Sequence, residues 1–129
     1  MRSFLTPLVD ADAGAFVLRN ARTRGVVASE LLPAFDSKSR QVGLLGRESL
    51  PPLAAMLIAP TNAIHTFFMK FPIDVIFVAK DGRVVKIRSA LRAWRLSACL
   101  RGHAVIEMAA DTVARTGTIV GDRLTVEPR

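Results

Sequence analysis

The stretch HTFFMKFPIDVIFVAKDG (residues 65–82) decides the fold, because it joins the densest apolar run of the chain to its clearest turn signal. Half of its residues are Phe, Met, Ile or Val, and this enrichment over a short run favours strand over helix. Pro72 divides the run, since proline removes a donor from the strand ladder, and we predict one strand at about 65–70 and a second at about 72–80. Asp81-Gly82, followed by the RVVKIR run, predicts a hairpin to a third strand.

The second of these strands carries a carboxylate among apolar neighbours. Side chains alternate along a strand, so Asp74 shares a face with Ile76 and Val78. A buried charge without a partner is costly, and we expect Asp74 to be hydrogen-bonded, paired with a cation or protonated. Lys70 and His65 are the nearest candidate partners in the sequence.

Length and composition predict one domain. A chain of 129 residues can bury about two-thirds of its unfolded surface, and we assign residues 15–129 to a single β-rich domain, preceded by a flexible N-terminal arm over residues 1–14. The apolar runs are far shorter than the roughly 20 residues that cross a bilayer, and the N-terminus lacks the long apolar region of a signal peptide. The single cysteine, Cys99, fits a reducing compartment. We therefore expect a cytoplasmic protein with no membrane partner.

The net charge of +7 is concentrated in one segment. Residues 80–101 hold seven arginines or lysines against one aspartate, a net charge of +6. Such a segment attracts phosphates and other anions, and the indole within RAWR offers a face on which a nucleic-acid base can stack. Basic residues at alternating strand positions are also typical of the solvated face of a half-buried sheet. The candidate nucleic-acid or anion-binding residues are Lys86, Arg88, Arg92, Trp94 and Arg95.

The remaining strands are read from short apolar runs between turn signals. We predict them at 15–20, 25–32, 53–59, 103–110 and 123–127. We expect Pro33 to end the second of these strands. The basic segment around Trp94 is predicted to be irregular and to lie across an open end of the sheet.

A short helix is predicted between the second and third of these strands. Asp36 or Ser37 begins it, and it runs to about Leu45. Val42 and Leu45 are expected to face inward, and Gly46 supplies the left-handed end.

A second short helix, TVAR, follows Asp111 as its cap and ends at Gly117. The whole pattern therefore contains about seven short strands and two short helices. It indicates a β-rich α+β domain, built as a curled sheet or partly open barrel.

Five segments, in this order and spacing, resemble one known family. They are GLLGRESL (43–50), HTFFMKFPIDVIFVAKDGRVV (65–85), the Trp94-Arg95-Leu96 step, AVIEMAA (104–110) and TGTIVGD (116–122). Together they are similar to the bacterial and archaeal family called domain of unknown function 192, the UPF0127-type uncharacterised proteins, over about residues 15–127. The resemblance implies a small β-rich domain and no assigned activity.

Position by position, the resemblance also marks a set of characteristic residues. They are Gly43, Leu44, Gly46, Arg47, His65, Thr66, Phe68, Met69, Lys70, Pro72, Asp74, Phe77, Glu107, Gly121 and Asp122. The chain departs from the family pattern beside Glu107, where Ala-Ala-Asp stands in place of Pro-Ala-Gly, and at Ala93, where the family has proline.

Four ionisable residues lie in strongly apolar surroundings: Asp74, Glu107, His65 and Lys70. Shifted acidity and functional roles concentrate in such places. The favoured hypothesis is a non-catalytic module that binds a small ligand or a partner near His65, Lys70 and Asp74. A structural alternative is an ion pair of Asp74 with Lys70 or Arg47 that pins two strands. The candidate ligand-binding residues are His65, Thr66, Lys70, Asp74, Arg47 and Glu107.

Catalysis and metal binding are less well supported by the sequence. A hydrolase-type enzyme would use His65 with Asp74 or Glu107 as base and orienter, but no serine or cysteine lies in a recognisable nucleophile elbow, so no catalytic residue is assigned. His65, His103, Asp74, Glu107 and Cys99 lack the close spacing of a metal site, and no glycine pattern for a nucleotide is present. We therefore expect neither a metal nor a cofactor.

Overall fold

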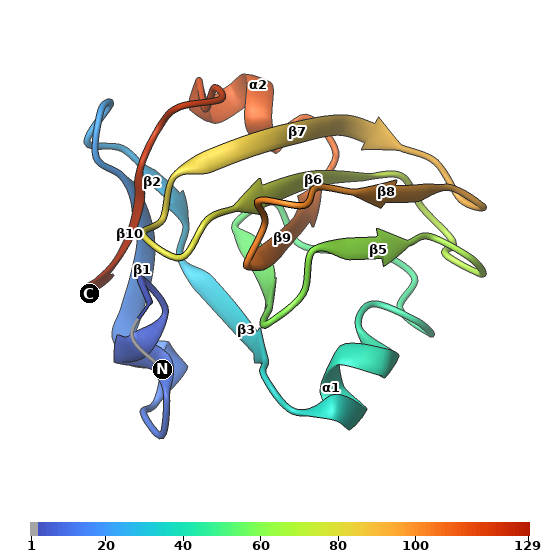
Figure 1. Ribbon diagram of the computed structural model, residues 1–129, viewed down its shortest axis with the longest axis horizontal. Coiled ribbons are helices and arrows are strands. Elements are labelled where there is room, and N and C mark those ends of the chain that lie inside the picture. The colour runs from blue at the N-terminus through green and yellow to red at the C-terminus, as the bar shows by residue number, and fades with distance from the viewer. Residues whose placement is uncertain (1–2) are drawn as a thin grey trace.

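The structure is a computed structural model that describes residues 3–129. Within this range the chain forms ten strands and two α-helices (Figure 1). The strands are β1 (Phe16–Asn20), β2 (Val26–Ala28), β3 (Glu30–Ala34), β4 (Ala54–Ile58), β5 (Ala63–His65), β6 (Ile73–Val78), β7 (Val84–Leu91), β8 (Leu96–Ala98), β9 (Ala104–Ala109) and β10 (Leu124–Pro128). The α-helices are α1 (Ser37–Val42) and α2 (Thr112–Thr116), and two 3-10 turns, η1 (Thr6–Leu8) and η2 (Ala13–Ala15), precede β1.

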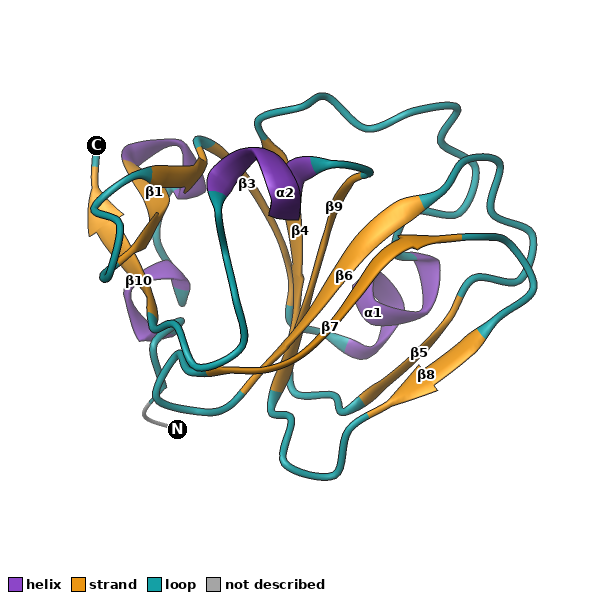
Figure 2. Cartoon of the chain, turned by 90° about the horizontal axis from the view of Figure 1, so that it is seen from above, coloured by secondary structure: helices purple, strands orange, loops and turns teal. Residues whose placement is uncertain are grey.

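The described residues form three sheets, and none of them closes into a barrel. The largest has the order β3-β4-β9-β6-β7, in which β3 and β4 are parallel and all other neighbours are antiparallel. A three-stranded sheet, β10-β1-β2, lies on one side of it, and a two-stranded ribbon, β5-β8, lies on the other (Figure 2). The predicted β-rich class with two helices is confirmed, whereas the predicted count of about seven strands is wrong.

The stretch that decides the fold forms β6 and a hairpin to β7, as predicted. All six residues of β6 are buried, because β9 and β7 pair with it on its two sides and both of its faces are covered. The hairpin turns at Asp81-Gly82. Gly82 has a φ of 92°, and a Cβ at this position would lie 2.2 Å from the carbonyl oxygen of Leu124. The close approach of β10 therefore requires glycine here.

The predicted strand at 65–70 is mostly a loop. β5 ends at His65, and the chain from residue 66 to 72 consists of turns and bends. β8 pairs with β5 within the basic segment for which the sequence predicts irregular structure. Strands of three residues carry too little periodicity to be recognised in a sequence.

The predicted strand at 25–32 divides into β2 and β3 around Ser29. Pro33 lies inside β3 and does not end it, so this prediction is wrong. The reason is that β3 is the edge strand of its sheet, where a residue without an N–H interrupts no ladder.

Helix α1 is shorter than predicted. Asp36 is its N-cap, with Oδ1 accepting a 2.8 Å hydrogen bond from the Ser39 amide, and the helix ends at Val42. Because the chain leaves the helix before Leu44, that side chain is buried, whereas Val42 and Leu45 are exposed and do not face inward as predicted.

Helix α2 ends at Gly117 in the left-handed conformation, as predicted. Asp111 does not cap it, because Asp111 itself has a left-handed φ of 79° and its side chain makes no capping hydrogen bond. The amide of Val113 instead donates to a carboxylate from β6, that of Asp74.

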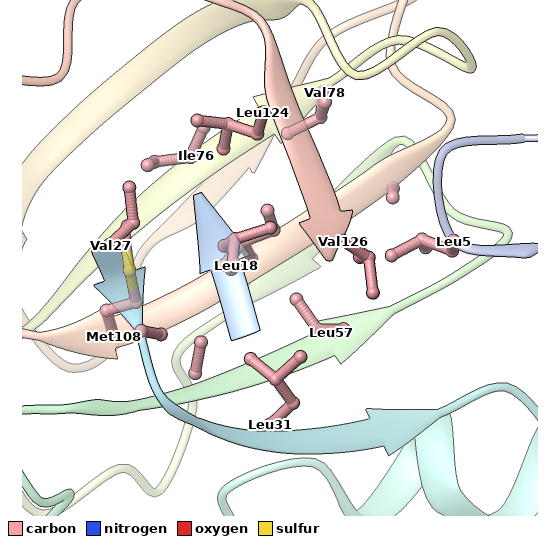
Figure 3. Close-up of a cluster of buried hydrophobic side chains, with 14 of the residues drawn as sticks. Leu5, Leu18, Val27, Leu31, Leu57, Ile76, Val78, Met108, Leu124 and Val126 are labelled. Atoms are coloured by element: carbon pink, nitrogen blue, oxygen red, sulfur yellow. The ribbon is translucent and has the colours of Figure 1, made fainter. Parts of the chain in front are cut away.

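Two hydrophobic cores lie on opposite faces of the five-stranded sheet. The first lies toward β1 and β10 and includes Leu18, Leu57, Ile76, Met108 and Leu124 (Figure 3). The second lies toward β5 and includes Met56, Ile58, Val75, Phe77 and Val105.

The predicted N-terminal arm falls partly outside the structure, since residues 1–2 are not in the described range. Leu5 and Leu8 are buried in the first core, so they pack this segment against the domain. Among residues 3–129, no helix has the length and hydropathy needed to cross a membrane.

Candidate functional site

Glu107 is a buried carboxylate that has no partner among residues 3–129. It lies on β9 between Met56 of β4 and Val75 of β6, on the face of the second core, and is only 5% exposed. Its carboxylate makes no hydrogen bond or ion pair within residues 3–129. Burial among apolar side chains disfavours the charged form and raises the pKa of Glu107 to about 7. At neutral pH the group is therefore divided between its acid and its carboxylate form.

A cavity of about 140 Å³ reaches this carboxylate. It lies between α1 with the loop after it, the end of β4, and β5, which are neighbours in Figure 1. Its walls are mainly apolar and include Leu44, Ile58, Ile64 and Met69. Several polar side chains, including that of Glu107, also line it, so the cavity is a mainly apolar hollow with polar groups at its wall.

Arg40 lines the same cavity, but it does not neutralise Glu107. Its Nη1 donates to the Phe35 carbonyl at 2.7 Å and lies 3.5 Å from the Ala59 carbonyl oxygen. The pKa of Glu107 is raised by burial, with no opposing effect from a neighbouring cation. The guanidinium thus contacts the backbone at Phe35 and at Ala59, and it forms no ion pair with Glu107 among the described residues. The sequence did not mark Arg40 as a site residue, because its role depends on where α1 meets β4.

His65, the last residue of β5, also lines the cavity. Its Nδ1 accepts a hydrogen bond from the Phe67 amide at 3.3 Å, so the neutral ring carries its proton on Nε2. No hydrogen bond joins His65 to Glu107 among the described residues. The two groups share one cavity, and this pair is the part of the predicted site that the fold brings together.

Asp74 has a structural environment. It is buried on the face of the first core, where Oδ1 accepts a hydrogen bond from the Ala90 amide and Oδ2 accepts one from the Val113 amide, both at 2.8 Å. The prediction that Lys70, His65 or Arg47 pairs with this carboxylate is wrong. Two backbone amides satisfy it, and they come from segments 16 and 39 residues away in the sequence.

The other predicted ligand-binding residues lie outside the cavity. Lys70 forms an exposed ion pair with Glu48 at 2.7 Å. Thr66 is buried, and its hydroxyl donates to the Arg92 carbonyl at 2.6 Å while accepting from the Arg95 amide at 2.9 Å. Arg47 is exposed and lines a different cavity, of about 410 Å³.

Trp94 of the basic segment forms an aromatic cluster with Phe67 and Phe68, in which Phe68 and Trp94 are exposed. The Trp94 ring stacks on Phe67, with 5.4 Å between centroids, and meets Phe68 edge-on at 4.7 Å. Arg92 and Arg95 flank Trp94 and are exposed. The sequence predicts that Phe67 and Phe68 lie on a strand. In the structure they lie on a loop, and this loop brings them to Trp94.

Two predicted basic residues of this segment lie on β7. Arg88 is exposed, whereas Lys86 donates to the Ala98 carbonyl at 2.7 Å and lies 5.5 Å from the centroid of the Phe77 ring. Lys86 therefore connects β7 to β8, and the exposed cations of the segment are its arginines and Lys80.

Asp122 shows how a buried carboxylate of this chain is held when it is structural. It accepts hydrogen bonds from Asn20 Nδ2 at 2.8 Å, Arg22 Nε at 2.6 Å and the Ile119 amide at 2.9 Å. The hydrogen bond from Arg22 is the main reason that the pKa of Asp122 falls to about 2. Glu107 has none of these partners. Within the described range, no three His, Cys, Asp or Glu side chains gather where they would hold a metal ion.

Comparisons with known proteins identify the family and the fold. A protein from Sinorhizobium meliloti 1021, described as a candidate transcription regulator, has a crystal structure with a TM-score of 0.75 and 24% identity, over 86% of this chain and 91% of that chain. A protein of unknown function from Novosphingobium aromaticivorans DSM 12444 has a TM-score of 0.73 and 23% identity, over 84% of this chain and 81% of that chain. No curated protein matches the chain significantly. The model of the family DUF192, described as "Uncharacterized ACR", matches residues 19–126, and the chain therefore belongs to this family.

Proposed function

We propose that the protein is a non-catalytic module that binds a small ligand in the cavity formed over Glu107. The observation that carries this proposal is the unpaired carboxylate, 5% exposed, at the wall of an apolar cavity. His65 shares the cavity and supplies a second polar group. The predicted site near His65 is thus kept, but its centre moves from Lys70 and Asp74 to Glu107.

The free energy of folding supports a functional role for Glu107. A rise in the pKa of Glu107 from 4.5 to about 7 on folding lowers the free energy of unfolding at pH 7 by about 3 kcal/mol. This cost is a large part of the stability of a small domain. A side chain that weakens the fold and receives nothing from its surroundings is typical of a functional site. Asp74 and Asp122, by contrast, are each held by donors and stabilise the fold.

Binding is favoured over hydrolysis by what lines the cavity. Asp74 lies on the opposite face of the sheet, so it cannot orient His65. The hydroxyl at the cavity is that of Thr61, which donates to the Ala63 carbonyl at 3.0 Å and has no adjacent base. A nucleophile activated by a histidine or a carboxylate requires such a base within hydrogen-bond reach.

A fragment screen by NMR tests the proposal. We expect small fragments to shift the amide resonances of β5, β9 and the loop after α1. The variant Ile64→Phe places a larger side chain at the cavity wall and should abolish these shifts. The matched control is Val9→Phe, which enlarges a side chain at a separate cavity near Leu5 and Phe35 and should leave them unchanged. Shifts confined to other surfaces, or equal in both variants, would contradict the proposal.

A second candidate function is the binding of single-stranded nucleic acid at the aromatic cluster. Phe68 and Trp94 are 69% and 56% exposed, and both have left-handed backbone conformations, with φ of 66° and 64°. Bulky residues avoid this conformation, and its cost is tolerated mainly at functional positions. Aromatic faces beside arginines suit bases and phosphates respectively.

Binding to a fluorescent oligothymidine at several salt concentrations tests this candidate. The double variant Arg92→Ala/Arg95→Ala should lower the salt slope by about 1.4, since each phosphate contact contributes about 0.7 on single strands. The control Lys38→Ala/Arg47→Ala removes the same charge beside α1 and should keep the slope. Equal losses in the two double variants would indicate attraction by net charge alone.

A further inference from the structure

We propose that the ligand of the Glu107 cavity is a small organic cation, namely a protonated amine on a compact apolar body. This inference rests on the proposed function, because it names the chemical class of ligand that the same cavity takes. It follows from three properties of the cavity: the unpaired carboxylate, the apolar walls and the small volume.

The carboxylate sets the requirement for a donor. An ionised carboxylate only accepts hydrogen bonds, and no N–H or O–H group of the described chain donates to Glu107. A bound molecule must therefore supply the donor. An ammonium group supplies both the donor and the opposite charge, and hydrogen bonds between charged partners are about twice as strong as neutral ones.

The walls and volume limit the rest of the ligand. An apolar cavity of about 150 Å³ holds one benzene-sized molecule, so a cavity of about 140 Å³ accommodates a ring or a short branched chain. Anionic ligands are disfavoured because the buried carboxylate repels them. Leu44, Ile58, Ile64 and Met69 offer only apolar contact to the body of the ligand.

A metal cation fits the same site poorly. Calcium takes six to eight oxygen ligands and magnesium near-ideal octahedral oxygen geometry, whereas Glu107 is the only carboxylate among the described residues that line the cavity. The other charged or titratable groups that face the cavity are Arg40 and His65. Arg40 donates to a backbone carbonyl, and His65 Nδ1 accepts from the Phe67 amide.

Three probes with the same ring separate the chemical classes. Cyclopentylamine is a cation and a donor, cyclopentanol is a neutral donor, and cyclopentanone is an acceptor. Each is titrated into the full chain at pH 5, 6, 7 and 8, and the amide shifts of β9 and β5 give the dissociation constant. The amine stays protonated throughout, because alkylammonium groups titrate near pH 10.

The expected result is that the amine binds more tightly than the alcohol and the ketone. Its affinity should rise about 50-fold from pH 5 to pH 7 and then level off, since the ionised fraction of a group with a pKa of about 7 rises tenfold per pH unit below that value. Tighter binding of the ketone, strengthening as the pH falls, would mean that protonated Glu107 donates to a carbonyl. That outcome, or equal affinity for all three probes, would overturn the organic cation while leaving small-ligand binding intact.

Two variants assign the effect to the carboxylate. Glu107→Gln should abolish both the preference for the amine and the pH dependence, and a pH dependence as steep as that of the wild type would contradict the inference. Glu48→Gln removes an exposed carboxylate that pairs with Lys70 outside the cavity, and it should bind the amine as the wild type does. Equal weakening in both variants would show a general charge effect and contradict the inference. If no probe binds, the inference is wrong, and the fragment screen with Ile64→Phe decides the broader proposal separately.

Discussion

Asp74 and Glu107 lie on neighbouring strands, one residue apart in register, and point to opposite faces of the same sheet. Asp74 of β6 pairs with Met108 of β9, and Glu107 of β9 pairs with Val75 of β6. Side chains alternate across a sheet, so one carboxylate enters the first core beside α2 and the other enters the second core beside the cavity. One is satisfied by backbone amides and the other by nothing in the described chain. This contrast separates a structural carboxylate from a candidate site.

Asp74→Asn should destabilise the protein by about 2–3 kcal/mol, because an amide replaces one of the two accepting oxygens by a donor that faces a backbone N–H. Urea denaturation at pH 7 measures the change. Asp111→Asn alters an exposed carboxylate that does not cap α2, and it should change the free energy of unfolding by less than about 0.5 kcal/mol. A loss of similar size in both variants would contradict the assigned role of Asp74.

Glu107→Gln should stabilise the protein relative to wild type more at high pH than at low pH. The pKa of Glu107 is raised from 4.5 to about 7, so ionisation costs folding free energy as the pH rises through this window, whereas at pH 4 the acid form is present in both folded and unfolded states. The stability difference between variant and wild type should therefore increase by about 3 kcal/mol between pH 4 and pH 8. Urea denaturation at both pH values measures it. A difference that stays constant would mean that Glu107 is not the titrating group.

Gly82→Ala should be severely destabilising, by about 4 kcal/mol, because the added Cβ would lie 2.2 Å from the Leu124 carbonyl oxygen and the hairpin would have to move away from β10. Gly46→Ala is the matched control, since Gly46 also has a positive φ, of 84°, but a Cβ added there would meet no atom within 4 Å. The control should cost about 1–2 kcal/mol, the conformational cost alone. Thermal unfolding followed by circular dichroism compares the two, and equal losses would exclude the close contact as the cause.

Thr66→Val should loosen the aromatic cluster, because the Thr66 hydroxyl joins the loops that carry Phe68 and Trp94 through bonds to Arg92 and Arg95. We expect a loss of about 1–2 kcal/mol in the free energy of unfolding, since two part-buried hydrogen bonds, to the Arg92 carbonyl and from the Arg95 amide, are lost. Trp94 is the only tryptophan of the chain, so its fluorescence emission should also move to longer wavelength. Thr66→Ser keeps the hydroxyl and should retain the wild-type emission. A change as large in the serine variant would assign the effect to the lost methyl group.

The sequence predicted the elements whose signals are local. The β6–β7 hairpin follows from an apolar run and an adjacent Asp-Gly turn. The start of α1 follows from Asp36, whose carboxylate accepts a hydrogen bond from the Ser39 amide three residues later. β9 is read from its apolar residues in the same way. These elements are formed by neighbours in the chain, and residue types at short spacing encode them directly.

The sequence also placed Glu107 and His65 among the candidates, because both are polar groups in apolar surroundings. It could not distinguish them from Asp74, Lys70 and Thr66, because the partners of a polar residue decide whether it is free to bind a ligand or stabilises the fold. Those partners come from distant segments: Val113 lies 39 residues from Asp74, and Arg95 lies 29 residues from Thr66.

Only the tertiary structure decided which carboxylate was left open. The order β4-β9-β6 and the register of β9 place Glu107 between Met56 and Val75, where no donor of the described residues reaches it, and bring α1 and β5 together over it. Residue types at short spacing determined the strands and their turns. The physical state of the buried charges was set by pairings across the sheet, because hydrogen bonding and desolvation depend on what surrounds a group in space and not on what precedes it in the chain.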